Sequence, residues 1–367
     1  MVTACGSQDG ASPPAPTPAS PTVKETPVTR ETPRLTQAEL DEAFLRATAD
    51  GDLPLLRQVL RQGADIGIHD QYDGTGLIRA AERGHWRVAG ELMQAGVARD
   101  HVNNLGWTAL HEAVFLGDGD ADALATVRVL VAAGVDVDVR ATRDGSTARE
   151  YAVSKGFRAI ADLLREAEQP RPGNANDRLL RAAASGDADG VALALRDGAS
   201  REVRDGHRRT ALLLASAADH VDVAQVLIAL GADPDALDDR HDTPWLVTGV
   251  TGSVAMGRVL RTSNPDLTIR NRYGGISVIP ASERGHADYV RWVVGTGIKV
   301  NHVNDLGWTA LLEAVILGDG SAPYQQIVTT LLDAGADPEL ADRDGVTALE
   351  HAEEKGQAEV ARILRAR

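Results

Sequence analysis

The chain contains 367 residues, of which 38 are Lys or Arg and 53 are Asp or Glu, so its formal net charge is −15. Aromatic residues make up 4% of the sequence and hydrophobic residues 43%, which indicates aliphatic cores in thin helical layers. The single cysteine, Cys5, excludes an intramolecular disulfide and a cysteine-based zinc cluster. The acidic charge argues against nonspecific binding of nucleic acid or anionic membranes. No run of about 18 apolar residues predicts a membrane span.

Residues 1–37 are expected to form a disordered tether, because this Pro/Ser/Thr-rich segment holds too little apolar material to fold. Just before the proline-rich part, the sequence VTACGS at 2–7 resembles the end of a bacterial lipobox, in which the cysteine is lipidated. Neither a charged segment nor an apolar segment precedes Cys5 in this sequence. Two alternatives therefore stand, a lipid anchor on Cys5 and a free cysteine in a cytoplasmic tail.

The remaining residues, 38–367, repeat one unit. The sequence DGSTA at 144–148 recurs as DGVTA at 344–348, and GADP at 231–234 recurs at 335–338. Ten such units follow one another, and six of the nine intervals between them are 33 residues long. These features resemble the ankyrin repeat, a turn followed by a short helix and a longer one. The resemblance implies an all-α ankyrin-repeat solenoid of about ten helix–turn–helix units, stabilised by stacking of neighbours.

A second, longer periodicity indicates that a block of repeats was duplicated. Residues 101–119 and 302–320 agree at sixteen of nineteen positions at an offset of 201. We therefore predict an N-terminal array of four repeats (38–168), a junction (169–176) and a C-terminal array of six repeats (177–367). The junction contains two prolines and a glycine and falls in a unit interval of only 30 residues. Imperfect stacking is expected there, and a bend is favoured over two freely jointed halves.

The resemblance also implies where a partner would bind, because ankyrin repeats generally use their turn tips and the exposed end of the first helix. Transferred to this sequence, the positions of units three and nine are Trp107, Phe115, Leu116, Trp308, Ile316 and Leu317, and those of units two and eight are Glu82, Arg83, Glu283 and Arg284. Tryptophan and large apolar residues at solvated positions would form an exposed partner site. The alternative is that the inserted Gly-Asp-Gly loops at 117–119 and 318–320 cover both tryptophans.

Other candidate sites carry less weight. The residues Asp118, Asp120 and Asp122 alternate as at the start of a calcium loop, but no glutamate stands at its bidentate end, and a solvated loop is favoured. Histidines at the repeat positions are expected to bond between turns. No metal, no cofactor and no catalytic residue is predicted, so we do not expect an enzyme.

The functional hypothesis is a noncatalytic, monomeric protein-binding scaffold, lipid-anchored through Cys5 outside the cytoplasm of a bacterium. Its 34 Arg against four Lys fit a GC-rich bacterial coding bias. The alternative hypothesis is a cytoplasmic or secreted regulator that acts on another protein. The identity of the protein partner does not follow from the sequence.

Overall fold

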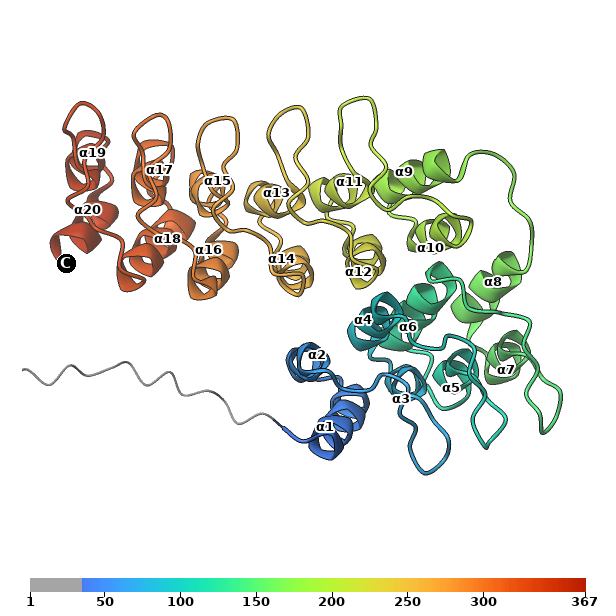
Figure 1. Cartoon of the computed structure of the whole chain (residues 1–367). Helices are drawn as coiled ribbons and strands as arrows, with labels where there is room; N and C mark the ends of the chain where they lie inside the picture. Colours follow the sequence, from blue (N-terminus) through green and yellow to red (C-terminus); the bar gives the residue numbers. More distant parts are fainter. Residues whose placement is uncertain (1–34) are drawn as a thin grey trace, which may run out of the picture. The chain divides into compact units, whose positions relative to one another are not determined.

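The computed structural model describes residues 35–367, so Cys5 and most of the expected tether lie outside the described residues. Within this part the helices form ten consecutive pairs (Figure 1), and the expected all-helical repeat architecture is confirmed. The first four pairs are α1 (Gln37–Asp50), α2 (Leu53–Gln62), α3 (Gly76–Glu82), α4 (Trp86–Ala95), α5 (Ala109–Phe115), α6 (Ala121–Ala132), α7 (Ala148–Lys155) and α8 (Arg158–Ala167).

The other six pairs follow a connecting segment. They are α9 (Ala175–Ser185), α10 (Ala188–Arg196), α11 (Ala211–Ala217), α12 (Val221–Ala229), α13 (Pro244–Thr251), α14 (Val254–Arg261), α15 (Val278–Glu283), α16 (Ala287–Val293) with the 3-10 turn η1 (Val294–Thr296), α17 (Ala310–Ile316), α18 (Ala322–Asp333), α19 (Ala348–Glu354) and α20 (Ala358–Arg365). No helix among residues 35–367 has the length and apolar character needed to cross a membrane.

Each pair is defined by local sequence signals at its ends. A buried threonine begins most first helices. The Thr210 side chain, for example, accepts a hydrogen bond from the Leu213 backbone N–H (3.2 Å) and satisfies one free donor of α11. Glycines such as Gly231 (φ +80°) follow the second helices, because a left-handed backbone there costs glycine little. Small alanines then allow close stacking, and Ala215 of α11 is fully buried.

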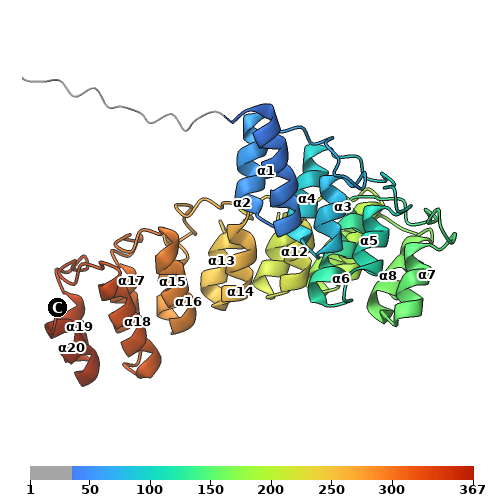
Figure 2. The ribbon, with the colours of Figure 1, turned by 90° about the horizontal axis from the view of Figure 1, so that it is seen from below.

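The two arrays pack against each other through their second helices. Helix α6 contacts α10 and α12, and α4 contacts α12 (Figures 1 and 2). The close approach requires Gly90 in α4, because a Cβ atom there would lie 2.4 Å from the Ala229 carbonyl oxygen. The Gln94 amide donates to that same oxygen over 2.8 Å. The hairpin loops, which connect each pair to the next, lie on opposite sides of these packed second helices in Figure 1.

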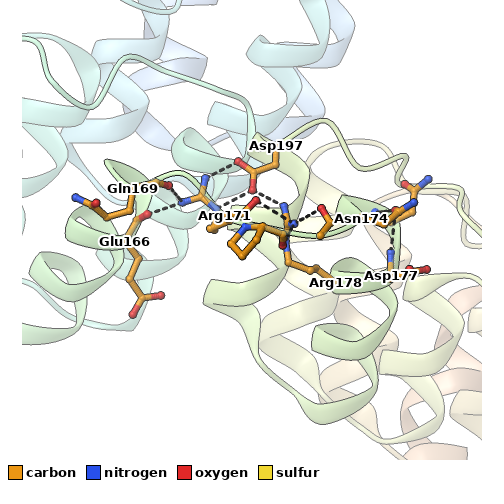
Figure 3. Close-up of polar contacts among 10 residues, drawn as sticks. Glu166, Gln169, Arg171, Asn174, Asp177, Arg178 and Asp197 are labelled. Carbon is orange, nitrogen blue, oxygen red and sulfur yellow. Dashed lines mark hydrogen bonds and ion pairs between the residues drawn. The ribbon is translucent and has the colours of Figure 1, made fainter.

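The segment between α8 and α9 is held by an arginine–aspartate cluster (Figure 3). Asp197, directly after α10, accepts a hydrogen bond from Arg171 Nε over 2.7 Å and also pairs with Arg178. The Arg178 guanidinium donates to the backbone oxygens of Pro172 and Gly173, both over 2.8 Å. The hydrogen bond and charge of Arg171, followed by those of Arg178, hold the pKa of Asp197 below its ordinary value. The junction is therefore an ordered turn that reverses the direction of the stack.

Candidate functional site

A groove of about 190 Å³ lies in the N-terminal array and is formed by two hairpin loops and the first helices α3 and α5. We call it the N-terminal groove. Its ten lining residues include Asp70, Tyr72, Arg79, Glu82, Glu112 and Leu116.

A second groove, of about 270 Å³, is formed by the corresponding elements of the C-terminal array, including α15 and α17. We call it the C-terminal groove. Each of its ten lining residues stands 201 positions after a lining residue of the N-terminal groove, and eight of the ten are identical. The two exceptions are Asn271 in place of Asp70 and Pro280 in place of Arg79. Both copies of the duplicated block therefore form the same groove.

A buried carboxyl group lies in each groove. Glu112 is 3% exposed and Glu313 4%. The amide of Asn103 donates to Glu112 over 2.7 Å, and Asn304 donates to Glu313 over 2.8 Å. The oxygen of each asparagine side chain also accepts from backbone N–H groups of its own hairpin loop. One asparagine therefore holds both the loop and the carboxyl group in place.

Burial makes these carboxyl groups hard to ionise. It raises the pKa of Glu112 above its ordinary value, and the hydrogen bond from Asn103 opposes this effect. Burial and the nearby Glu283 carboxylate raise the pKa of Glu313 to about 7. Among the charges near Glu112, Glu82 and Asp70 raise its pKa and Arg79 lowers it, whereas no cation alters the pKa of Glu313 in the described residues.

The rims of both grooves are apolar and exposed. Ten large hydrophobic side chains are exposed in the described part of the chain, and half of them line the two grooves. These five are Tyr72 (49%), Leu116 (45%), Tyr273 (53%), Leu306 (49%) and Leu317 (48%). Such a concentration around two buried carboxyl groups marks the grooves as the candidate contact sites.

Trp107 departs from the expectation of a solvent-exposed ring. It is only 9% exposed, because it lies against Phe115 (4.5 Å between ring centroids) and against Tyr151 of the next repeat. Its Nε1 donates to the Tyr151 hydroxyl over 3.3 Å. The inserted loop packs elsewhere, since a Cβ at Gly119 would lie 2.3 Å from the Phe157 ring. Trp107 is thus a packing residue, and Phe115 remains 38% exposed beside it.

Trp308 has a different environment from its counterpart. It is half-buried, as is Ile316, and no aromatic ring packs on it within residues 35–367. The position of Tyr151 is occupied by His351, whose Nε2 bonds to Asp342 over 2.7 Å. The two tryptophans thus occupy equivalent positions in the duplicated block but have different surroundings.

The four charged candidates divide into two kinds. Glu82 and Glu283 line the grooves, and Glu82 accepts from Arg79 Nη1 over 3.2 Å. Arg83 and Arg284 are exposed, line neither groove, and form no ion pair with any residue that the structure describes. The grooves therefore unite Leu116, Leu317 and the two glutamates, but not the arginines or the tryptophans.

Within residues 35–367, one group of side chains lies close enough together to hold a metal, namely His69, Asp73 and His101. The His101 Nε2, however, already bonds to the backbone oxygen of Asp73 over 2.7 Å. The equivalent His302 makes the same bond to Gly274 in the C-terminal array, where no such group exists. We therefore assign His101 a structural role, which is to hydrogen-bond the hairpin loop. In the inserted loop, Asp120 caps α6 by accepting from Ala123 N over 2.9 Å.

A larger cleft of about 480 Å³ lies where the two arrays meet, with Gln94 and Arg99 among its lining residues. Both side chains are engaged with backbone oxygens, Gln94 with Ala229 and Arg99 with Ala133. These two polar side chains of the cleft are therefore less available to a ligand than the carboxyl groups of the grooves.

Sequence reasoning missed the buried Asn–Glu pairs and the groove tyrosines. A signal was present, because Asn103 and Glu112 lie in the block that is nearly identical between the copies. A glutamate within the apolar stretch ALHEAV at 109–114 also marks a buried carboxyl group rather than a solvated one.

Comparison with known proteins agrees with this architecture. A model for ankyrin repeats in three copies matches residues 44–141 and 278–367, and a single ankyrin repeat matches residues 207–239. A putative ankyrin repeat protein of Escherichia coli K12, YahD, is 39% identical over 186 residues, covering 50% of this chain and 92% of YahD.

Solved structures give the same result. The crystal structure of an ankyrin repeat domain from Acinetobacter baumannii is 45% identical, with a TM-score of 0.50, and covers 51% of this chain and 96% of its own. The ankyrin repeat protein EF0377 is 36% identical, with a TM-score of 0.50 and coverage of 52% and 97%. The chain belongs to the ankyrin repeat family, whose repeats are protein–protein interaction modules.

Proposed function

We propose that this chain is a noncatalytic scaffold that binds a protein partner on the face formed by its hairpin loops and first helices. The observation that carries the proposal is the pair of grooves, in which exposed apolar rims surround buried carboxyl groups. Apolar side chains at the centre of an interface supply most of its binding energy, and polar groups around them set its specificity.

The test compares residues of the C-terminal groove with a matched exposed residue elsewhere. A partner captured by the full chain is titrated against Tyr273→Ala, Leu306→Ala and Leu317→Ala. Val153→Ala is the control, because Val153 in α7 is 62% exposed and lines neither groove. We expect at least one groove variant to weaken binding by about 30-fold, which corresponds to about 2 kcal/mol. Equal affinities for all four variants would contradict binding at this groove.

We also propose that the scaffold is tethered to a bacterial membrane by a lipid on Cys5. The support is the lipobox-like sequence at 2–7 followed by a proline-rich segment long enough to separate the repeats from a surface. A cytoplasmic regulator of another protein is the alternative, and the distribution of a Cys5 variant between membrane and soluble fractions decides between them.

A further inference from the structure

The two grooves differ in charge at only two lining positions. In the N-terminal groove, Arg79 forms ion pairs with Asp70 and with Glu82. Its guanidinium carbon also lies 5.8 Å from the centre of the Tyr72 ring. The N-terminal groove therefore contains its own guanidinium group, placed between two carboxylates and beside an aromatic ring.

The C-terminal groove lacks this arginine and keeps only part of its surroundings. Pro280 replaces Arg79, and the neutral Asn271 replaces Asp70. The groove retains Tyr273, Glu283 and the buried Glu313. Its volume is about 270 Å³, against about 190 Å³ for the N-terminal groove.

The two carboxyl groups of the C-terminal groove have no cationic partner within residues 35–367. Glu283 forms no ion pair there. Glu313 is 4% exposed, and Asn304 donates to one of its oxygens over 2.8 Å. Arg272 lies over Tyr273 at 4.5 Å, but it pairs with Asp242 and is not a lining residue. The lining of the groove therefore contains two carboxyl groups and no cation, which favours a positively charged ligand.

We propose that the C-terminal groove binds an arginine side chain presented by the partner protein, in the place that Arg79 occupies in the N-terminal groove. This inference rests on the proposed function. A planar guanidinium there can donate to Glu283, as Arg79 does to Glu82, and pack on the Tyr273 ring, which a lysine ammonium cannot do as well. Its charge would also lie near Glu313, as that of Arg79 lies near Glu112. Leu306 and Leu317 at the rim would cover the aliphatic part of that arginine.

The electrostatics of the groove agree with this assignment. Burial and the Glu283 carboxylate raise the pKa of Glu313 to about 7, so both oppose the ionisation of Glu313. In the N-terminal groove Glu82 and Asp70 likewise raise the pKa of Glu112, but the guanidinium of Arg79 acts in the opposite direction. A bound guanidinium would lower the pKa of Glu313 in the same way.

The experiment uses the full chain and three small probes: N-acetyl-arginine amide, N-acetyl-lysine amide and the uncharged N-acetyl-citrulline amide. Binding is followed by NMR shifts of the Gly275 and Leu317 backbone amides. We expect the arginine probe to shift both signals and to bind at least tenfold more tightly than either of the other probes. Equal binding of the lysine or citrulline probe, or no binding of the arginine probe, would overturn the proposal.

Two variants exploit the duplication. Pro280→Arg introduces the resident arginine, so it should fill the groove and weaken the arginine probe at least tenfold. Arg79→Ala should create a second site, seen as new shifts at Gly74. If Pro280→Arg fails to fold, as judged by circular dichroism, Glu283→Gln decides, and it too should weaken the probe at least tenfold. Unchanged binding in the folded variants would overturn the proposal.

The same variants separate this inference from the proposed function. The partner could lose affinity for the Leu306 and Leu317 variants but bind folded Pro280→Arg normally. It would then bind this face without inserting an arginine into the groove. That result would refute the arginine site and leave the scaffold proposal intact.

Discussion

Replacing Glu313 with glutamine is expected to stabilise the folded chain at pH 8 far more than at pH 5. Glutamine has nearly the same shape, and its oxygen can still accept the hydrogen bond that Asn304 donates over 2.8 Å. The change therefore removes the charge and keeps the packing. Its effect reports the cost of ionising a carboxyl group that is 4% exposed.

The magnitude follows from the pKa of Glu313. Burial raises this pKa from 4.5 to about 7 in the folded chain. At about 1.4 kcal/mol for each pKa unit, the ionised form costs roughly 3 kcal/mol once the pH is well above 7. About 1 kcal/mol of this cost is already present at pH 5, because the unfolded chain ionises near pH 4.5. The free energy gained by the variant should therefore be about 2–3 kcal/mol larger at pH 8 than at pH 5.

The sign of the effect follows from proton linkage. The folded chain holds the Glu313 proton more tightly than the unfolded chain does, so protonation favours folding. The stability of the wild-type protein should thus fall as the pH rises from about 4.5 to about 7, and part of that fall should vanish in Glu313→Gln. Bound arginine would oppose the trend, since it stabilises the ionised form.

Urea unfolding of the full chain at both pH values, followed by circular dichroism, measures these free energies. Glu359→Gln is the matched control. Its hydrogen bonds with Arg362 hold the pKa of Glu359 below its ordinary value, so Glu359 is ionised at both pH values and its replacement should show no pH dependence. If Glu313→Gln changes stability equally at pH 5 and pH 8, burial does not raise the pKa of Glu313 as described above.

Four further changes test other parts of the structure. Trp107→Ala should cost about 3–5 kcal/mol of unfolding free energy because it leaves a cavity, and Trp308→Ala, which removes a half-buried ring, should cost clearly less; equal losses in urea unfolding would contradict their different packing. Gly90→Val should cost about 1–3 kcal/mol by forcing α4 from α12, and an unchanged melting temperature would contradict the contact between the arrays. Asp197→Ala should cost about 1–3 kcal/mol and speed amide hydrogen exchange at residues 169–174, whereas unchanged exchange would show that the arginine cluster does not hold the junction. Cys5→Ser should move the protein, expressed from its natural gene, from the membrane to the soluble fraction, and equal fractionation of both forms would favour the cytoplasmic alternative.

The helix pairs could be predicted from the sequence because their signals are local. A capping threonine, an apolar face and a terminal glycine stand within one unit, and the 33-residue interval repeats them. The packing of the arrays depends on contacts between distant helices, so no single unit reveals it. The sequence nevertheless contains one sign of this packing. Helix α6 is buried nearly all round, from Ala123 to Ala132, whereas its counterpart α18 carries Gln325 and Gln326.

The candidate site was only partly predictable for the same reason. Leu116 and Leu317 follow from the repeat pattern, since the end of a first helix is fixed by local structure. The burial of Trp107 depends on Tyr151, which belongs to the next repeat and lies 44 residues away. A repeat consensus describes one unit, so it does not describe which side chain of the next unit covers it.

The duplication itself supplies the strongest argument about the grooves. Eight of ten lining residues are the same in both copies, so a difference in their chemistry must come from the two that changed. The exchange of Arg79 for Pro280 removes a cation from a carboxylate-lined groove, and the exchange of Asp70 for Asn271 removes only one of the carboxylates. Glu313 helps to hold Asn304 and its hairpin loop, as Glu112 helps to hold Asn103 in the other array. What the C-terminal groove lacks is the cation, and the closeness of Glu313 to Glu283 becomes favourable once a cation is supplied from outside the chain.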